Sequence, residues 1–167
     1  MFLLQGLVLG TFAVTVFVNS PAASSSDADA IKQTALDYIE GWYDGDAARM
    51  EKALHPELAK RIVWTDASGQ NTLGQMSAMT LVQRTREGTG KSDTTRQKDV
   101  TILDVFENAA MVKVVATDWV DYLQEAKWNG HWKIVNVLWE LKPEAKARRA
   151  AASKKEHDRK AVRFFPS

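Results

Sequence analysis

The chain has 167 residues, 45% of them hydrophobic, which supports one ordinary core with tails rather than two domains. A formal net charge of +1 gives no reason to expect nucleic acid or a membrane surface as a partner. The absence of cysteine excludes disulfides, thiol catalysis and cysteine-ligated metals. The histidines, His55, His131 and His157, lie on separate segments without metal-ligand spacing, so we expect no metal and no cofactor.

Residues 1–22 have the pattern of a signal peptide. An apolar run to Val18 is followed by small residues at Ser20 and Ala22, which predicts cleavage near Ala22 and a secreted or periplasmic protein that does not contact the membrane afterwards. No Lys or Arg precedes the run, and its length approaches the ~20 residues of a membrane span. An uncleaved, membrane-anchored segment is therefore the alternative.

Beyond a linker at residues 23–28, apolar residues recur at helical spacing and predict an amphipathic helix with one broad apolar face. We expect Asp27 or Asp29 to cap this helix and Gly45 to end it. The apolar positions are Ile31, Ala35, Tyr38, Ile39 and Trp42.

Two further helices are predicted, the first capped by Asp46 and extending to Leu54, the second capped by Ser77. Between them, residues 61–65 are expected to form a strand and residues 66–71 a loop.

The second half of the domain changes to β-branched and aromatic runs. Asn129-Gly130 between two of them predicts a type I′ hairpin, because both residues tolerate positive φ. The sequence therefore predicts an α+β fold in which about three N-terminal helices pack in a strongly bent antiparallel β-sheet, over residues 29–141. The runs are 100–106, 109–117, 120–128 and 131–139.

Residues 142–167 follow the last β-run and contain nine Lys or Arg and three acidic residues. This composition predicts a basic extension that is partly helical or disordered.

Three short motifs carry a family resemblance: Leu-His-Pro at 54–56, Asp-Tyr-Leu at 121–123 and Asn-Gly-x-Trp-Lys-Ile-Val-Asn at 129–136. In this order and spacing they make the chain resemble the lumazine-binding-like family of the nuclear-transport-factor-like (cystatin-like) superfamily. The resemblance implies a cone-shaped fold with a small-molecule pocket. Glu125 departs from it, because the family pattern usually has an apolar residue there, and residues 142–167 have no counterpart in the family core.

The same resemblance implies a homodimer. In residues 131–139, the alternation of side chains places apolar residues on both faces of the sheet. The helices can cover one face, and in this superfamily a second subunit commonly covers the other. We therefore expect dimerisation through the outer sheet face.

Candidate catalytic residues are Asp121, Asp118 and His55. Enzymes of this fold, such as ketosteroid isomerases and polyketide cyclases, use a carboxylate base in a desolvated pocket. The residues also allow structural interpretations: a turn for Asp118, a salt-bridged strand carboxylate for Asp121 and a helix-terminus hydrogen bond for His55.

Aromatic residues are the candidate pocket lining. Tyr38 and Trp42 are four residues apart and share the helix face that must meet the sheet. From the strands we expect Trp64, Tyr122 and Trp139 to contribute. Such a pocket would suit a small apolar or aromatic molecule.

Three functions remain open from the sequence: an exported small-molecule-binding domain of unknown ligand, a small isomerase, dehydratase or cyclase, and a protein-interaction module. Whether the protein is an enzyme stays undecided. An apolar open cone would favour binding, an open cone with a buried carboxylate would favour catalysis, and a filled cone would favour interaction.

Overall fold

The fold was established from a computed structural model that describes residues 25–66, 68–92, 94 and 96–164. The predicted signal peptide at residues 1–22 lies outside the described residues. The first helix begins within the segment expected to be a linker.

Three helices come from the first half of the chain, as the sequence predicts. Helix α1 (Ser25–Asp44) buries one apolar face and ends at Gly45, whose φ of +71° is accessible to glycine without strain. Helix α2 (Ala47–Ala53) is capped by Asp46, which accepts a hydrogen bond from the Arg49 amide at 3.0 Å. Helix α3 (Ala78–Arg86) is capped by Ser77.

The start of α1 differs from the prediction. The helix begins at Ser25, so Asp27 lies in its first turn rather than at its cap. The Asp27 carboxylate accepts hydrogen bonds from Lys127 (2.7 Å) and from the Trp132 indole (3.0 Å), which connects the helix to the sheet.

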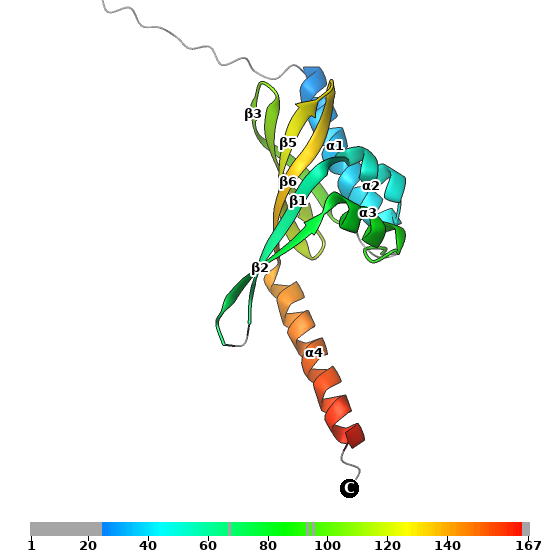
Figure 1. Ribbon diagram of the computed structural model, residues 1–167, viewed down its shortest axis with the longest axis vertical. Coiled ribbons are helices and arrows are strands. Elements are labelled where there is room, and N and C mark those ends of the chain that lie inside the picture. The colour runs from blue at the N-terminus through cyan, green and yellow to red at the C-terminus, as the bar shows by residue number, and fades with distance from the viewer. Residues whose placement is uncertain (1–24, 67, 93, 95, 165–167) are drawn as a thin grey trace, which may run out of the picture.

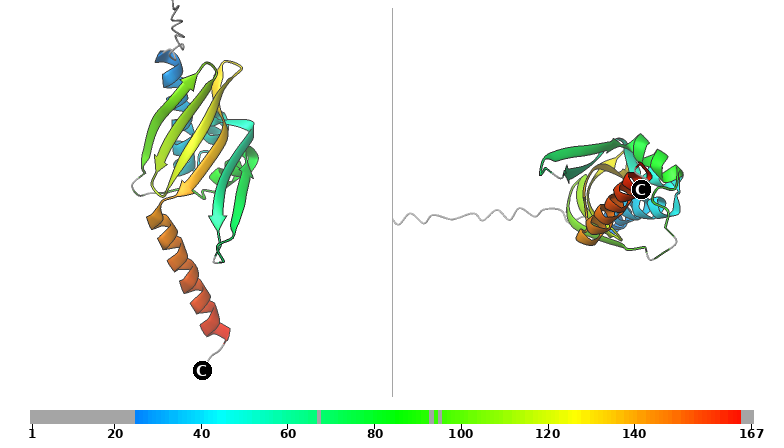
Figure 2. Two further views of the ribbon diagram at one scale, coloured as in Figure 1. Left: turned by 90° about the vertical axis from the view of Figure 1, so that its left-hand side faces the viewer. Right: turned by 90° about the horizontal axis from the view of Figure 1, so that it is seen from below.

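Six strands form one sheet in the order β2-β1-β6-β5-β4-β3, antiparallel at every neighbouring pair except the parallel pair β1 and β6. In the view from below, the strands form an arc around the helices (Figure 2). The strands are β1 (Leu54–Thr65), β2 (Asn71–Ser77), β3 (Lys98–Phe106), β4 (Ala109–Ala116), β5 (Trp119–Trp128) and β6 (His131–Leu141).

Two strand assignments in the first half of the chain differ from the sequence prediction. Strand β1 begins at Leu54, which was expected to be the last residue of the second helix, and so starts well before the strand predicted at residues 61–65. Strand β2 was not predicted because its sequence is polar and contains a glycine, Gly74. An added Cβ at Gly74 would lie 2.8 Å from the Trp64 indole nitrogen. The Asn129-Gly130 turn is confirmed, with φ of +50° and +79°.

A bulge in β6 changes which side chains face the core. The register to β5 shifts between Gln124 and Glu125, so the regular alternation along residues 131–139 breaks. Trp132, Ile134 and Val137 are consequently all buried on the inner face. The sequence analysis assumed an unbroken period of two along residues 131–139, and this assumption does not hold at the bulge.

Glu125 places a carboxyl group in the core. Its side chain is 1% exposed, and neither carboxylate oxygen has a hydrogen-bond partner among the described residues. Its neighbours across the strands are the buried Ala110 and Ile134. Burial raises the pKa of Glu125 to about 8. The group is therefore largely protonated in the folded protein at neutral pH.

Helix α4 (Pro143–Phe164) follows β6 directly and points away from the domain (Figure 1). Its first turns touch the domain through the buried Ala145 and through ion pairs from Lys146 to Glu140 and from Arg148 to Asp118. None of the helices in the described part of the chain is both long and apolar enough to cross a membrane.

We predict that Glu125→Leu raises the free energy of unfolding, and raises it more at pH 8 than at pH 5. The folded protein holds a proton that the unfolded chain releases near the ordinary pKa of 4.5. Wild-type stability should therefore fall by about 1.4 kcal/mol per pH unit between about 5 and about 8, and the variant should lack this slope. Urea unfolding across this pH range measures the difference. Glu125→Gln, a neutral isostere, should also lack the slope, and an unchanged slope in both variants would contradict the assignment.

Candidate functional site

A cavity of about 800 Å³ lies at the end of the domain from which α4 departs. Its walls come from the second half of α1, from β1, β2 and α3, from the loop after α3, from the turn between β4 and β5, from β6 and from the first turns of α4. Segments far apart in the sequence therefore build one site. The volume is within the range of ordinary small-molecule pockets.

Aromatic side chains form much of this cavity. Tyr38 and Trp42 line it from α1, Trp64 from β1 and Trp139 from β6, so the structure brings together four of the five predicted pocket residues. The Trp64 and Trp139 rings meet edge to face, with centroids 6.0 Å apart and planes at 90°. Trp119, which the sequence analysis did not select, also lines the cavity.

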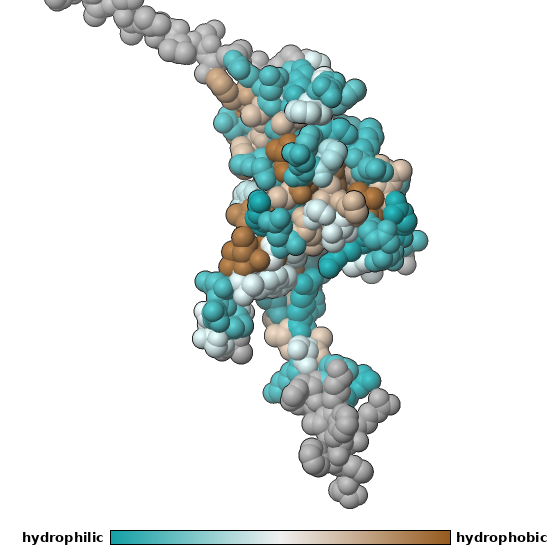
Figure 3. Space-filling model, viewed as in Figure 1, coloured by the Kyte–Doolittle hydropathy of each residue, from teal (hydrophilic) through white to brown (hydrophobic). Residues whose placement is uncertain are grey.

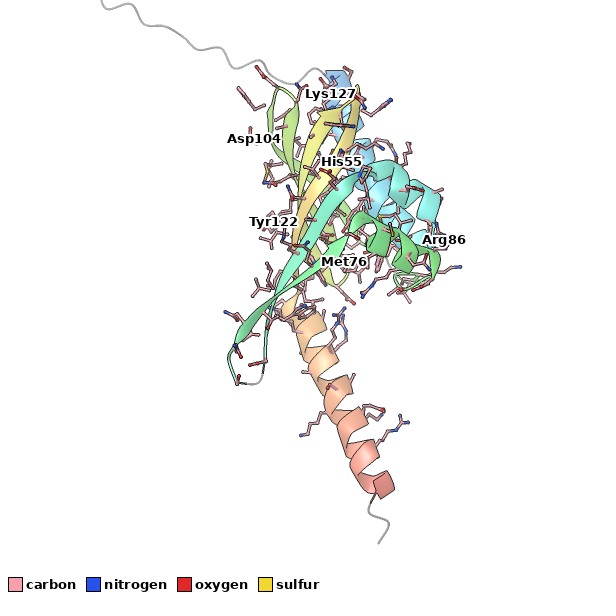
Figure 4. The ribbon with its side chains drawn as sticks, viewed as in Figure 1. His55, Met76, Arg86, Asp104, Tyr122 and Lys127 are labelled. Carbon is pink, nitrogen blue, oxygen red and sulfur yellow. The ribbon has the colours of Figure 1, made fainter. Side chains whose placement is uncertain are left out.

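Tyr122 and His55 do not line the cavity. Tyr122 alternates with the inward-facing Asp121 on β5, so its side chain lies on the outer face and is 43% exposed. Figure 4 shows Tyr122 on the side of the sheet away from helices α1 to α3, and His55 in the half of the domain away from α4. The His55 ring packs edge to face against Trp128, with centroids 4.9 Å apart.

The loop after α3 packs directly on Trp42. An added Cβ at Gly90 would lie 2.0 Å from the Trp42 indole nitrogen, so only glycine permits this approach. Gly90 thus positions a wall of the cavity. Apart from the glycine itself, nothing in the sequence signals this contact.

A buried polar cluster lies behind the aromatic lining. The Lys60 ammonium donates to Asp121 Oδ1 at 2.5 Å and to the Tyr38 hydroxyl at 2.6 Å. Tyr38 and the Trp119 indole donate to Asp121 Oδ2 at 3.1 and 2.5 Å. Lys60 and Tyr38 line the cavity, whereas Asp121 lies behind them and is fully buried.

Burial sets the protonation preferences of this cluster. Removal from water, and then the negative charge of Asp121, raise the pKa of the Tyr38 phenol well above its ordinary value, so it stays protonated and donates. Burial lowers the pKa of Lys60, while the Asp121 carboxylate opposes that change. The Lys60 ammonium also lies 4.9 Å from the centre of the Trp139 ring, a distance typical of a cation–π contact.

The three hydrogen bonds to Asp121 occupy most of the lone pairs of its carboxylate and leave little room for a hydrogen bond from a ligand. Its partner Lys60 was missed by the sequence analysis. The sequence does contain an indication of this role. Lys60 alternates with Leu58 and Ile62 along the strand, so it is a cation on the buried face of β1.

Asp118 lies on the rim of the cavity, in the turn between β4 and β5. Its carboxylate pairs with Arg148 of α4, and its backbone carbonyl accepts a hydrogen bond from the Lys142 amide at 2.9 Å. Asp118 thus connects the domain to the C-terminal helix. In the part of the chain that the structure describes, no three His, Asp or Glu side chains gather as a metal site would require.

The sequence model of the family described as "Putative lumazine-binding" matches residues 26–140. The protein belongs to this family. No curated protein matches the sequence.

Solved structures share the fold of this family member at low identity. An NTF2-like protein of unknown function from Methylobacillus flagellatus KT is 21% identical over 72% of this chain and 95% of its own, with a TM-score of 0.60. Another from Shewanella baltica OS155 is 18% identical over 74% and 99%, with a TM-score of 0.55. A protein of unknown function with a cystatin-like fold from Nostoc punctiforme is 13% identical over 72% and 94%, with a TM-score of 0.53. At these identities the likeness shows the fold alone.

We predict that Asp121→Asn lowers the free energy of unfolding by about 3 to 5 kcal/mol, because it leaves the Lys60 cation buried without a counter-charge. Combining it with Lys60→Met removes that charge and should restore a large part of the loss. Urea unfolding of both variants measures these differences. Asp118→Asn breaks an exposed pair and should cost less than about 1 kcal/mol. Wild-type stability of Asp121→Asn would show that the pair does not stabilise the fold.

Proposed function

We propose that this family member binds a small aromatic molecule in the cavity, and that the domain acts as a binding protein. The observation that carries the proposal is an open cavity of about 800 Å³ lined by Tyr38, Trp42, Trp64, Trp119 and Trp139. Flat rings on several sides gain contact area and favourable ring geometry with an aromatic ligand. The family description supports small-molecule binding in general and no particular ligand.

Catalysis is the second candidate, since a buried carboxylate does accompany the open cone. The geometry around it favours binding instead. A general base needs a free lone pair within reach of the substrate, and Asp121 is covered by Lys60, Tyr38 and Trp119. In our proposal the carboxylate holds Lys60 and Tyr38 in place at the cavity wall.

An interaction module with a filled cone has less support, because the cone encloses an open cavity. The apolar part of the outer sheet face nevertheless suits a second copy of the chain. Tyr122 and Leu138 are cross-strand neighbours there, and both are exposed. Figure 3 shows apolar side chains gathered close to the β1–β2 hairpin. Val63 and Leu73, which pair across this hairpin, are also exposed. We propose a homodimer through this face.

We also propose that the domain works outside the cytoplasm. The apolar run and small-residue exit of residues 1–22 support export, with an uncleaved anchor as the alternative.

The ligand proposal predicts that Trp42→Ala and Trp64→Ala each weaken binding of N-phenyl-1-naphthylamine, a neutral aromatic dye that fluoresces in apolar sites. Each variant should lose about fivefold in affinity, since one ring contact contributes about 1 kcal/mol beyond burial. Trp128→Ala, at the exposed hairpin end, is the matched control and should bind as wild type does. Fluorescence titration gives the affinities. Failure of wild type to bind any aromatic dye, or equal loss in all three variants, would refute the proposal.

The dimer proposal predicts that Leu138→Glu converts the protein to a monomer, because it buries a charge in the proposed interface. Light scattering after size-exclusion chromatography measures the mass. Met79→Glu on α3, which is 81% exposed and off the sheet, should leave the mass unchanged. A monomeric wild type would end this proposal.

The export proposal predicts that the mature chain begins near Ala23 when the full sequence is expressed in its native host. N-terminal sequencing of the purified protein decides this. Soluble cytoplasmic protein that retains Met1 would contradict export.

A further inference from the structure

Positively charged side chains outnumber negatively charged ones in the lining of the cavity. Among the described lining residues, the only carboxylate is that of Asp118. The cations come from β1, α3, the loop after α3 and α4, so they surround the cavity rather than follow one element. They are Lys60, Arg84, Lys91, Arg148 and Arg149.

Two of these five cations are already compensated. Lys60 pairs with Asp121 in the buried cluster, and Arg148 pairs with Asp118 at the rim. The remaining three, Arg84, Lys91 and Arg149, form no ion pair with any residue that the structure describes. The cavity therefore presents an excess of positive charge although the whole chain is almost neutral.

The placement of Arg84 is specific to the cavity side of α3. It lies one helical turn after Leu81, which is buried and also lines the cavity. Arg86, two residues further on, does not line the cavity and donates a hydrogen bond to Gln83 at 2.8 Å on the exposed side. Figure 4 places Arg86 at the outer end of α3.

Arg149 is positioned by α4. Ala145 of this helix is 3% exposed, and the Arg148–Asp118 pair holds the next turn against the rim. The C-terminal extension thus contributes to the site at the point where it leaves the domain.

We propose that the ligand of this cavity is an aromatic compound with an anionic group, a carboxylate or a phosphate, which binds to Arg84, Lys91 and Arg149 while its ring system lies between the tryptophans. The planar guanidinium group of arginine can donate two parallel hydrogen bonds to a carboxylate or to two oxygens of a phosphate. The three cations are exposed, so their attraction for an anion should weaken as the salt concentration rises. The proposal rests on small-molecule binding in the cavity, the function proposed above.

Two dyes that share one ring system test the anionic requirement. 1-Anilinonaphthalene-8-sulfonate carries a permanent negative charge, and N-phenyl-1-naphthylamine has the same rings without the sulfonate. The full-length protein is titrated with each dye at low and at physiological salt. Three versions are compared: wild type, the cavity variant Arg84→Gln/Lys91→Gln/Arg149→Gln, and the control variant Arg86→Gln/Lys154→Gln/Lys155→Gln. The two variants lose the same number of charges, all from exposed side chains.

We expect wild type to bind the sulfonate dye more tightly than the neutral dye, and the cavity variant to lose about tenfold in affinity for the sulfonate dye alone, as charge-assisted contacts of this kind imply. The control variant should bind both dyes with affinities within about twofold of wild type. Any difference between the two proteins for the sulfonate dye should shrink at physiological salt, because salt screens exposed charges. If the cavity variant does not fold by circular dichroism, Arg149→Gln alone, from the projecting helix, should still show a selective loss.

Two results would overturn the proposal while leaving aromatic binding intact. One is equal binding of the two dyes to wild type with no selective loss in the cavity variant. The other is an equal loss of the sulfonate dye in the control variant, which would show general surface attraction. Failure of wild type to bind either dye would instead reject the small-molecule function on which the proposal rests.

Discussion

The buried ion pair between Lys60 and Asp121 is the constraint on which the site depends. It joins β1 to β5, two strands separated by β6, and Tyr38 extends the connection to α1. Each charge is costly away from water, so each is tolerable only while the other is in place and hydrogen-bonded. The requirement fixes the spacing between helix and sheet at the cavity wall. It also holds the Trp119 indole, which donates to the same carboxylate, and places the Lys60 cation against the Trp139 ring.

Strand β5 carries a second buried carboxylate whose situation is the opposite. Glu125 lies four residues after Asp121 on the same inner face, but it has no cation and no hydrogen-bond partner among the described residues. Asp121 therefore contributes to a charged, ordered wall, whereas Glu125 is kept neutral by burial. The contrast shows that hydrogen-bond and ion-pair partners, rather than burial alone, decide the role of a carboxylate on the inner face of the sheet.

Local chemistry made much of the fold predictable from sequence. Gly45, Asp46, Ser77 and Asn129-Gly130 act through backbone conformation and nearby hydrogen bonds, and the helices and the hairpin follow from them. The β6 bulge could not be predicted, because it depends on how β5 and β6 pair over a distance. Only part of the cavity lining could be predicted from the sequence. Helical spacing placed Tyr38 and Trp42 on one face. The pairing of Lys60 with Asp121 and the position of Arg149 at the cavity depend on contacts between segments that are remote in the sequence.

The position of Arg149 also limits what family membership can say about the ligand. The family match ends at residue 140, before α4 begins at Pro143. Two of the cavity's cations, Arg148 and Arg149, therefore lie outside the segment that defines the family. A relative without such a helix would lack these charges at the rim. If the charges select the ligand, relatives with the same cone should differ in ligand class according to the segment that each carries after its last strand. Specificity would then be set by a C-terminal addition on a shared scaffold, as is common where one fold serves many functions.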